Sequence, residues 1–203
     1  MSPPTRQSAR DVANCAGREI WRLAIAALRQ LLLMRHAKSA WEEPGLTDHA
    51  RSLDAIGRAS AAAMRGAMMA LGLAPDLVLV SSARRTMQTL HLLEPWDETP
   101  LIEVIDTLYL ADLDALLGVL HAIPETLRSV MLIGHNPGIH ELALHLVGAA
   151  SLAQANADTR RLAVGYPTGA LCEFTVPGAW GNLAEGGARL QRFLAPRDLL
   201  GSA

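Results

Sequence analysis

The stretch that decides the fold is Leu31-Leu32-Leu33-Met34-Arg35-His36, a short apolar run that ends in a guanidinium and an imidazole. A run this short and this uniformly apolar is typical of a strand that is buried on both faces. Two similar runs lie at Leu77–Ser81 and Ser129–Gly134, and they are followed by Arg84-Arg85 and by His135. We therefore predict three buried strands that each deliver Arg or His at the carboxyl end.

The rest of the chain alternates between helix and strand patterns. Asp54 predicts a helix N-cap, Gly72 a helix end, and Asn136-Pro137 an N-cap followed by the first helical position. Helices are expected at about 54–71, 83–93, 112–122 and 137–147, and strands at 31–35, 77–81, 101–105, 129–134, 168–176 and 188–193. This alternation predicts an α/β fold, a three-layer α/β/α sandwich with a mostly parallel central sheet and one antiparallel edge strand. The Ala- and Gly-rich stretch 149–165 is expected to be an excursion without clear chemistry.

The first 29 residues are expected to be an N-terminal extension, partly helical, ahead of a single domain over 30–203. The pattern over 11–30 predicts a helix that packs on the domain or on a partner, and the alternative is an extension without a catalytic part. Arg18, Arg22 and Arg29 interrupt its apolar residues, and no small-residue cleavage site follows. The stretch therefore predicts neither a secretory signal nor a membrane span.

Composition narrows the class of protein. The chain has 203 residues, of which 50% are hydrophobic, and a formal net charge of −2, which suits one globular domain without the basic surface of a nucleic-acid-binding protein. Cys15 and Cys172 are far apart and match no metal-binding spacing. We expect a cytoplasmic protein that needs no metal and no cofactor. Its oligomeric state stays open.

The strand ends carry the chemistry. In an open α/β sheet, ligands bind at the carboxyl edge of the strands, where His36, His135 and the arginines should converge. Forked guanidinium groups suit the oxygens of a phosphoryl group, and a neutral imidazole is a good nucleophile near pH 7. The pattern therefore predicts a site for attack on phosphorus.

Three blocks of the sequence resemble those of the histidine phosphatase superfamily, also called the phosphoglycerate mutase-like family. Met34-Arg35-His36-Ala37 is similar to its first signature, the segment 80–89 to its Ser-Ser-x-x-x-Arg-Ala-x-Gln-Thr block, and Ile133-Gly134-His135-Asn136 to its second histidine block. The short chain and Arg51-Ser52-Leu53 resemble the SixA-like phosphohistidine phosphatase branch. Thr86 and Ser52 depart from the usual Ala and Pro, and neither position carries a chemical group of the reaction.

The resemblance implies a role for each matching residue. His36 is implied as the nucleophile that becomes phosphorylated. Arg35 and Arg85 would bind the phosphoryl oxygens with His135, and Arg51 would add a third guanidinium. Arg85 rather than Arg84 fits the motif, because it stands three residues before Gln88.

The general acid is less well defined by the sequence. The segment Asp106-Thr107-Leu108-Tyr109 resembles the Glu-x-x-Tyr stretch that carries the acid in the wider family, so Asp106 is the first candidate, with Glu103, Glu42 and Glu43 as alternatives. The resemblance implies a metal-independent phosphatase that acts on protein phosphohistidine. The alternatives are a small-molecule phosphomonoesterase or a mutase of the same fold, and the partner is accordingly a phosphorylated protein or a small phosphorylated substrate.

Overall fold

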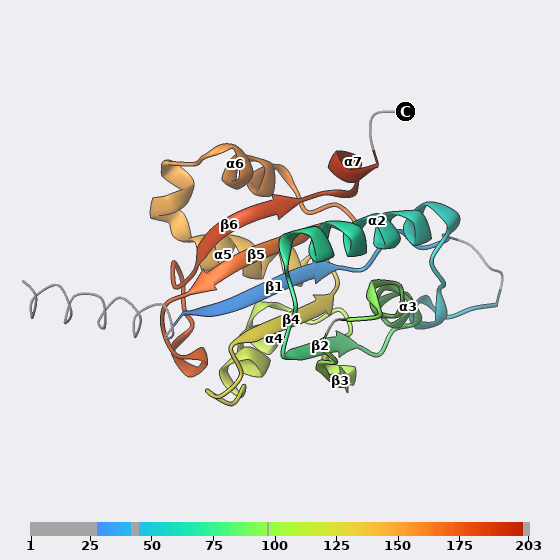
Figure 1. The fold of residues 1–203 in the computed structure, drawn as a ribbon, viewed down its shortest axis with the longest axis horizontal. Coiled ribbons are helices and arrows are strands. Elements are labelled where there is room, and N and C mark those ends of the chain that lie inside the picture. The colour runs from blue at the N-terminus through green and yellow to red at the C-terminus, as the bar shows by residue number, and fades with distance from the viewer. Residues whose placement is uncertain (1–27, 42–44, 97, 201–203) are drawn as a thin grey trace, which may run out of the picture.

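A computed structural model describes residues 28–41, 45–96 and 98–200. The described residues form a six-stranded sheet in the order β3-β2-β4-β1-β5-β6 (Figure 1). The strands are β1 (Arg29–Arg35), β2 (Leu77–Ser81), β3 (Leu101–Ile105), β4 (Ser129–Gly134), β5 (Leu171–Val176) and β6 (Arg189–Leu194). The pairs β1–β4, β4–β2 and β2–β3 are parallel, whereas β5 pairs antiparallel with both β1 and β6. The predicted α/β class is confirmed, and the strand that runs against the others is β5, one place in from the edge.

Helices cover both faces of the sheet (Figure 1). One face carries α2 (Ala55–Leu71), α3 (Arg84–Leu93) and the short α7 (Pro196–Leu199), and the other carries α4 (Leu113–His121), α5 (Gly138–Ala153) and α6 (Ala157–Val164). The described residues also form three single 3-10 turns: η1 (Asp48–Ala50), η2 (Asp106–Leu108) and η3 (Trp180–Asn182).

Side-chain alternation along β1 explains the two helical layers. Leu31 and Leu33 pack in the core that holds α4, α5 and α6, whereas Leu32 and Met34 pack in the core beneath α2 and α3. All four side chains are fully buried. Because successive strand residues point to opposite faces, a uniformly apolar strand requires cover on both sides.

Three of the predicted helix ends can be compared in detail. Asp54 caps α2 as expected, because its Oδ1 accepts from the backbone N–H of Gly57 at 2.6 Å, and Gly72 ends the helix with φ 65°. The Asn136 cap is wrong, because Pro137 takes the N-cap position of α5 and carries no side-chain acceptor. The amide of Asn136 instead donates to the carbonyl oxygen of Tyr166 at 3.1 Å.

Three other boundaries differ from expectation. Strand β1 begins at Arg29, so the predicted helix over 11–30 is wrong for its last two residues, and the rest of that prediction lies outside the described residues. Strand β5 begins only at Leu171. The stretch 149–165 contains α6, which begins after an Asn156 side chain that accepts from the N–H of Thr159 at 2.9 Å.

Gly57 lets the first turn of α2 approach the loop that follows β1. A Cβ at this position would lie 1.9 Å from the backbone oxygen of Lys38. That carbonyl also accepts the backbone N–H of Asp54 at 3.0 Å, so the helix start and the loop are fixed to each other. Within the part of the chain described here, no helix is long and apolar enough to cross a membrane.

We predict opposite effects for two alanine substitutions in α2. Gly57→Ala should lower Tm by several degrees, because the new methyl group meets backbone rather than a movable side chain. Gly66→Ala is the matched control, because a Cβ there meets nothing within 4 Å. It should stabilise by about 0.5–1 kcal/mol and raise Tm by about 1–4 °C. Calorimetry of both variants tests this, and equal shifts would contradict the close approach.

Candidate active site

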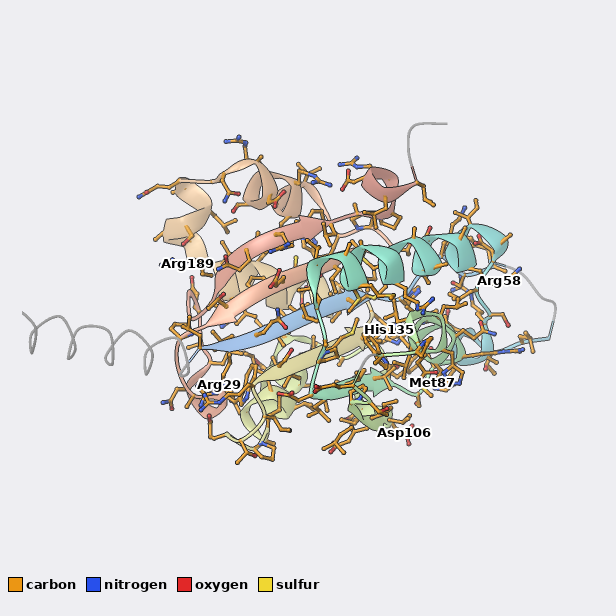
Figure 2. The ribbon with its side chains drawn as sticks, viewed as in Figure 1. Arg29, Arg58, Met87, Asp106, His135 and Arg189 are labelled. Atoms are coloured by element: carbon orange, nitrogen blue, oxygen red, sulfur yellow. The ribbon has the colours of Figure 1, made fainter. Side chains whose placement is uncertain are left out.

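The carboxyl ends of the central strands meet at one cavity. Figure 2 places His135 at this end of the sheet and Arg29 and Arg189 at the other. The pairing of Arg35 with Gly134 sets His36 and His135 side by side, with their ring centroids 5.2 Å apart. The cavity has a volume of about 290 Å³. Its lining residues are Arg35, His36, Lys38, Ser39, Trp41, Asp48, Arg51, Arg85, Leu110, His135, Asn136 and Thr168.

His36 is held as one neutral tautomer. Its Nδ1 lies 2.8 Å from the backbone oxygen of Ala37, so Nδ1 carries the proton and donates it, while Nε2 keeps its lone pair. The residue is 8% exposed. Burial, together with the charges of Arg85, Arg35 and Arg51, lowers its pKa to about 4, although the bond to Ala37 acts in the opposite direction. Near pH 7 the His36 imidazole is therefore uncharged and keeps a lone pair on Nε2, the state that a nitrogen nucleophile requires.

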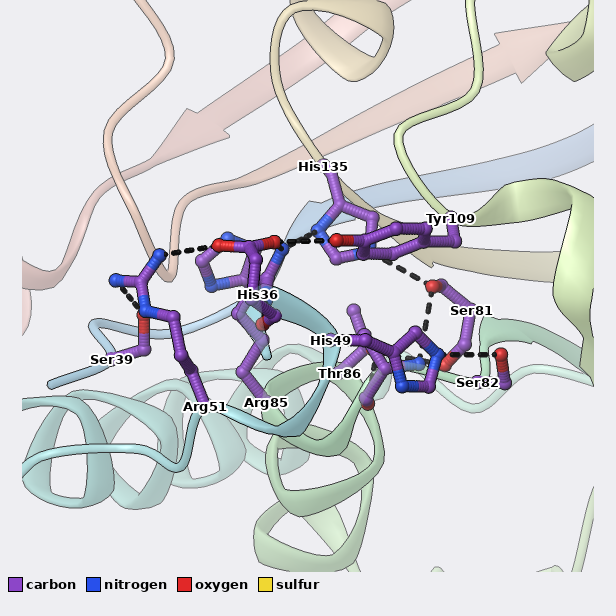
Figure 3. A network of polar contacts seen from close by, with 12 residues as sticks. His36, Ser39, His49, Arg51, Ser81, Ser82, Arg85, Thr86, Tyr109 and His135 are labelled. Atoms are coloured by element: carbon purple, nitrogen blue, oxygen red, sulfur yellow. Dashed lines mark hydrogen bonds and ion pairs between the residues drawn. The ribbon is translucent and has the colours of Figure 1, made fainter. Parts of the chain in front are cut away.

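His135 is the opposite tautomer. Its Nδ1 accepts from Nη2 of Arg85 at 3.2 Å, so the proton sits on Nε2 and is donated to the Ser81 hydroxyl at 2.8 Å (Figure 3). Burial is the main cause that lowers its pKa to about 3, and the neighbouring His36 and Arg85 add to the shift. In this arrangement both ring nitrogens are in use, and His135 supports the guanidinium of Arg85.

The predicted arginines reach the cavity from three segments. Arg35 donates through Nη1 to the Tyr166 carbonyl oxygen at 2.8 Å. Arg51 donates through Nη2 to the hydroxyl of Ser39 at 3.0 Å. Arg85, in the first turn of α3, is 3% exposed and lines the cavity, whereas Arg84 is exposed and does not line it. The structure thus brings Arg35, Arg51, Arg85 and both histidines together, and forked donors of this kind suit an oxyanion.

Asp48 is a site residue that the sequence reasoning missed. Its Oδ1 accepts from Arg51 at 2.8 Å, and its Oδ2 accepts from Arg85 at 3.0 Å and from the Tyr109 hydroxyl at 2.6 Å. The hydrogen bonds from Tyr109 and Arg51 and the charge of Arg85 hold the pKa of Asp48 well below its usual range. The one sequence signal is its position three residues before Arg51, in a loop that approaches the strands only in the folded chain.

Two of the four candidate general acids lie among the described residues, and neither lines the cavity. Asp106 is exposed at the start of η2, outside the residues that line the cavity, and Glu103 is exposed on β3 (Figure 2). Glu42 and Glu43 lie outside the described residues. The role of Asp106 as general acid stays a prediction. In the described segments, no three His, Cys, Asp or Glu side chains are grouped as metal ligands would be.

Comparisons with known proteins find similar solved structures and a similar plant protein. A solved structure from Agrobacterium tumefaciens, assigned as a SixA phosphohistidine phosphatase, is 31% identical with a TM-score of 0.70, and the match covers 83% of this chain and 98% of that one. A SixA assignment from Nakamurella multipartitia is 29% identical with a TM-score of 0.72, covering 83% and 96%. An uncharacterized chloroplastic protein of Arabidopsis thaliana is 33% identical, and the match spans 60% of each chain. No protein-family model matches the chain.

We predict that both site imidazoles stay neutral at about pH 5.5, one unit below the ordinary histidine pKa of about 6.5. Long-range ¹H–¹⁵N spectra should show His36 protonated on Nδ1 and His135 on Nε2. Because the unfolded chain binds these protons more tightly, stability should fall as the pH drops from about 6.5 toward the folded-state values of about 4 and about 3. The urea-unfolded chain is the control, and site signals that titrate with it would contradict the burial argument.

We also predict that Arg85 binds oxyanions and that Arg84 does not. Arg85→Ala should weaken vanadate or phosphate binding about tenfold to a hundredfold, the value of a lost hydrogen bond to a charged group. Arg84→Ala is the matched control, one residue earlier on the same helix but exposed. Calorimetric titration measures both, and a larger loss in Arg84→Ala would overturn the assignment.

Proposed function

Because the chain belongs to the histidine phosphatase superfamily, we propose that it is a metal-independent phosphatase that forms a phosphohistidine on His36 and acts on protein phosphohistidine. The observation that carries the proposal is the hydrogen bond from Nδ1 of His36 to the Ala37 backbone oxygen at 2.8 Å. It leaves the lone pair of Nε2 as the nucleophile, in a cavity that three arginines line.

The reaction has two steps. The Nε2 lone pair of His36 attacks phosphorus, and the bond to the leaving group breaks with its electron pair on that group. Water then attacks the phosphorylated His36, releases dihydrogen phosphate and returns the electron pair to Nε2. Nδ1 keeps its proton throughout, because the Ala37 carbonyl oxygen accepts from it in every state.

The arginines supply the charge stabilisation. Charge that spreads over three equatorial phosphoryl oxygens is matched by forked donors, which act without a metal ion. Arg35, Arg51 and Arg85 all line the cavity, so three guanidinium groups are available to an anion bound there.

The choice of phosphohistidine as substrate has two supports. The relatives from Agrobacterium tumefaciens and Nakamurella multipartitia are assigned as SixA phosphohistidine phosphatases. In addition, Asp106 and Glu103 do not line the cavity. An alkyl ester needs an acid to protonate its leaving oxygen, an effect worth about 10²–10⁴-fold. A protonated imidazole leaves more easily, so the cavity suits an N-phosphorylated substrate better.

We predict that His36→Asn removes both turnover and covalent labelling. Incubation with a ³²P-phosphohistidine peptide should label the wild-type chain, and the variant should stay unlabelled because it lacks the nucleophilic nitrogen. His91→Asn is the matched control, an exposed histidine on α3 away from the cavity, and it should keep both properties. A His36→Asn enzyme that retains turnover near the wild-type rate would disprove the covalent mechanism.

Activity should survive chelation. Guanidinium groups already supply the positive charge that a metal would otherwise provide, so turnover of 4-nitrophenyl phosphate should be the same before and after dialysis against EDTA. A loss that one divalent ion restores would contradict the proposal. Parallel metal analysis of the dialysed protein confirms that the chelator acted.

A further inference from the structure

One carboxylate stands among the guanidinium groups of the cavity. Asp48 is the sole Asp or Glu among the described residues that line it. Its side chain is 47% exposed, so it reaches both the arginines and the space that a substrate enters. The phosphatase chemistry proposed above uses the arginines and His36 and gives this carboxylate no part.

The contacts of Asp48 keep it ionised. Three donors, from Arg51, Arg85 and Tyr109, hold its two oxygens at 2.6 to 3.0 Å. Hydrogen bonds to the charged form of a carboxyl group favour that form. Asp48 therefore has no proton to give to the leaving oxygen of a phosphate ester. An anion at this position also repels an incoming dianionic ester.

The same carboxylate suits a cationic leaving group. Phosphohistidine that is protonated on the ring nitrogen remote from phosphorus has a cationic ring with an exposed N–H donor, beside its anionic phosphoryl group. A carboxylate accepts a hydrogen bond from such a group more strongly than a neutral acceptor does. It thereby favours the ring form that leaves as neutral imidazole.

We propose that Asp48 is a specificity-determining residue, which selects N-phosphorylated substrates by accepting a hydrogen bond from the protonated leaving ring; this inference rests on the proposed function. Solvent protonates the remote nitrogen before reaction. Nε2 of His36 then forms its bond to phosphorus while the substrate P–N bond breaks, and the electron pair stays on the departing nitrogen. The imidazole leaves neutral and keeps the proton that faces Asp48, so Asp48 neither gains nor loses one.

The other groups at the cavity mouth add aromatic and apolar surface beside the cations Lys38 and Arg51. Lys38 lines the cavity, and its ammonium group lies 3.7 Å from a carboxylate oxygen of Asp54. Trp41 is 81% exposed, and the Arg51 guanidinium carbon lies 4.8 Å from its ring centroid. Leu110 is 51% exposed at the same cavity. The mouth thus combines one carboxylate with aromatic and apolar surface.

The test compares two substrates in one variant. We would measure kcat/KM of Asp48→Asn for a phosphohistidine peptide and for 4-nitrophenyl phosphate, whose weakly basic leaving group departs as an anionic phenolate and has no N–H to donate to Asp48. The kcat/KM for the phosphohistidine peptide divided by that for 4-nitrophenyl phosphate should fall about tenfold to a hundredfold, as expected for a lost hydrogen bond to a charged group. Asp48→Glu keeps the carboxylate and should recover part of the ratio. Asp114→Asn, an exposed position on α4, is the matched control and should leave the ratio unchanged.

Each outcome separates selectivity from a merely structural role. Asp48 also holds Arg51 and Arg85, so a structural loss would lower both kcat/KM values together and weaken vanadate binding in proportion. An unchanged ratio in Asp48→Asn, with wild-type turnover of both substrates, overturns the selectivity of Asp48 and leaves the proposed function standing. A wild-type enzyme that hydrolyses 4-nitrophenyl phosphate and not phosphohistidine overturns both proposals.

Discussion

The hydrogen bond from the backbone N–H of His36 to the Gly134 carbonyl oxygen, 3.0 Å long, is the contact on which the site depends. It continues the parallel ladder of β1 and β4 one residue beyond the strands, so the segments that follow β1 and β4 leave the sheet in register. The two histidines then follow at the same level and on neighbouring strands. A shift by one residue would turn one imidazole toward the opposite face, because side chains alternate along a strand.

Charge is concentrated at this edge, and the rest of the site is arranged around that concentration. Burial and the nearby Arg85 guanidinium lower the pKa of Arg35, which indicates how closely the cations are placed. Burial is the main cause that lowers the pKa of His36 and of His135, and the nearby guanidinium charge of Arg85 adds to it, so both imidazoles are uncharged near pH 7. Asp48 offsets part of the repulsion by bridging Arg51 and Arg85. The site therefore balances anion binding against the cost of gathering like charges.

The local sequence pattern predicted the bounds of three strands and the cap of α2, because these features depend on neighbouring residues. The strands β2, β3 and β4 have the predicted bounds because each is a short apolar run between breakers, and Asp54 caps α2 because its side chain accepts from the backbone N–H of Gly57, only three residues ahead. Long-range contacts decided the rest. Arg29 and Gln30 end a helical sequence pattern but lie in strand β1, because this strand pairs with β4 and β5. Asp48 reaches the arginines only when its loop folds over the sheet. The placement of Arg85 was predictable because a motif fixed its spacing.

The hydrogen bond that sets the tautomer of His36 uses a main-chain acceptor, the carbonyl oxygen of Ala37. Every amino acid supplies that oxygen, so no substitution at position 37 deletes it. The location of the proton on His36 is thus shielded from substitutions at position 37, and a mutational scan of side chains would pass over the contact. Only an alteration of the peptide linkage itself, such as an ester in place of the amide between residues 37 and 38, would weaken this acceptor. The contact that sets the tautomer of His36 is therefore encoded by the backbone path, which the buried strand before it and the close approach of Gly57 after it hold in place.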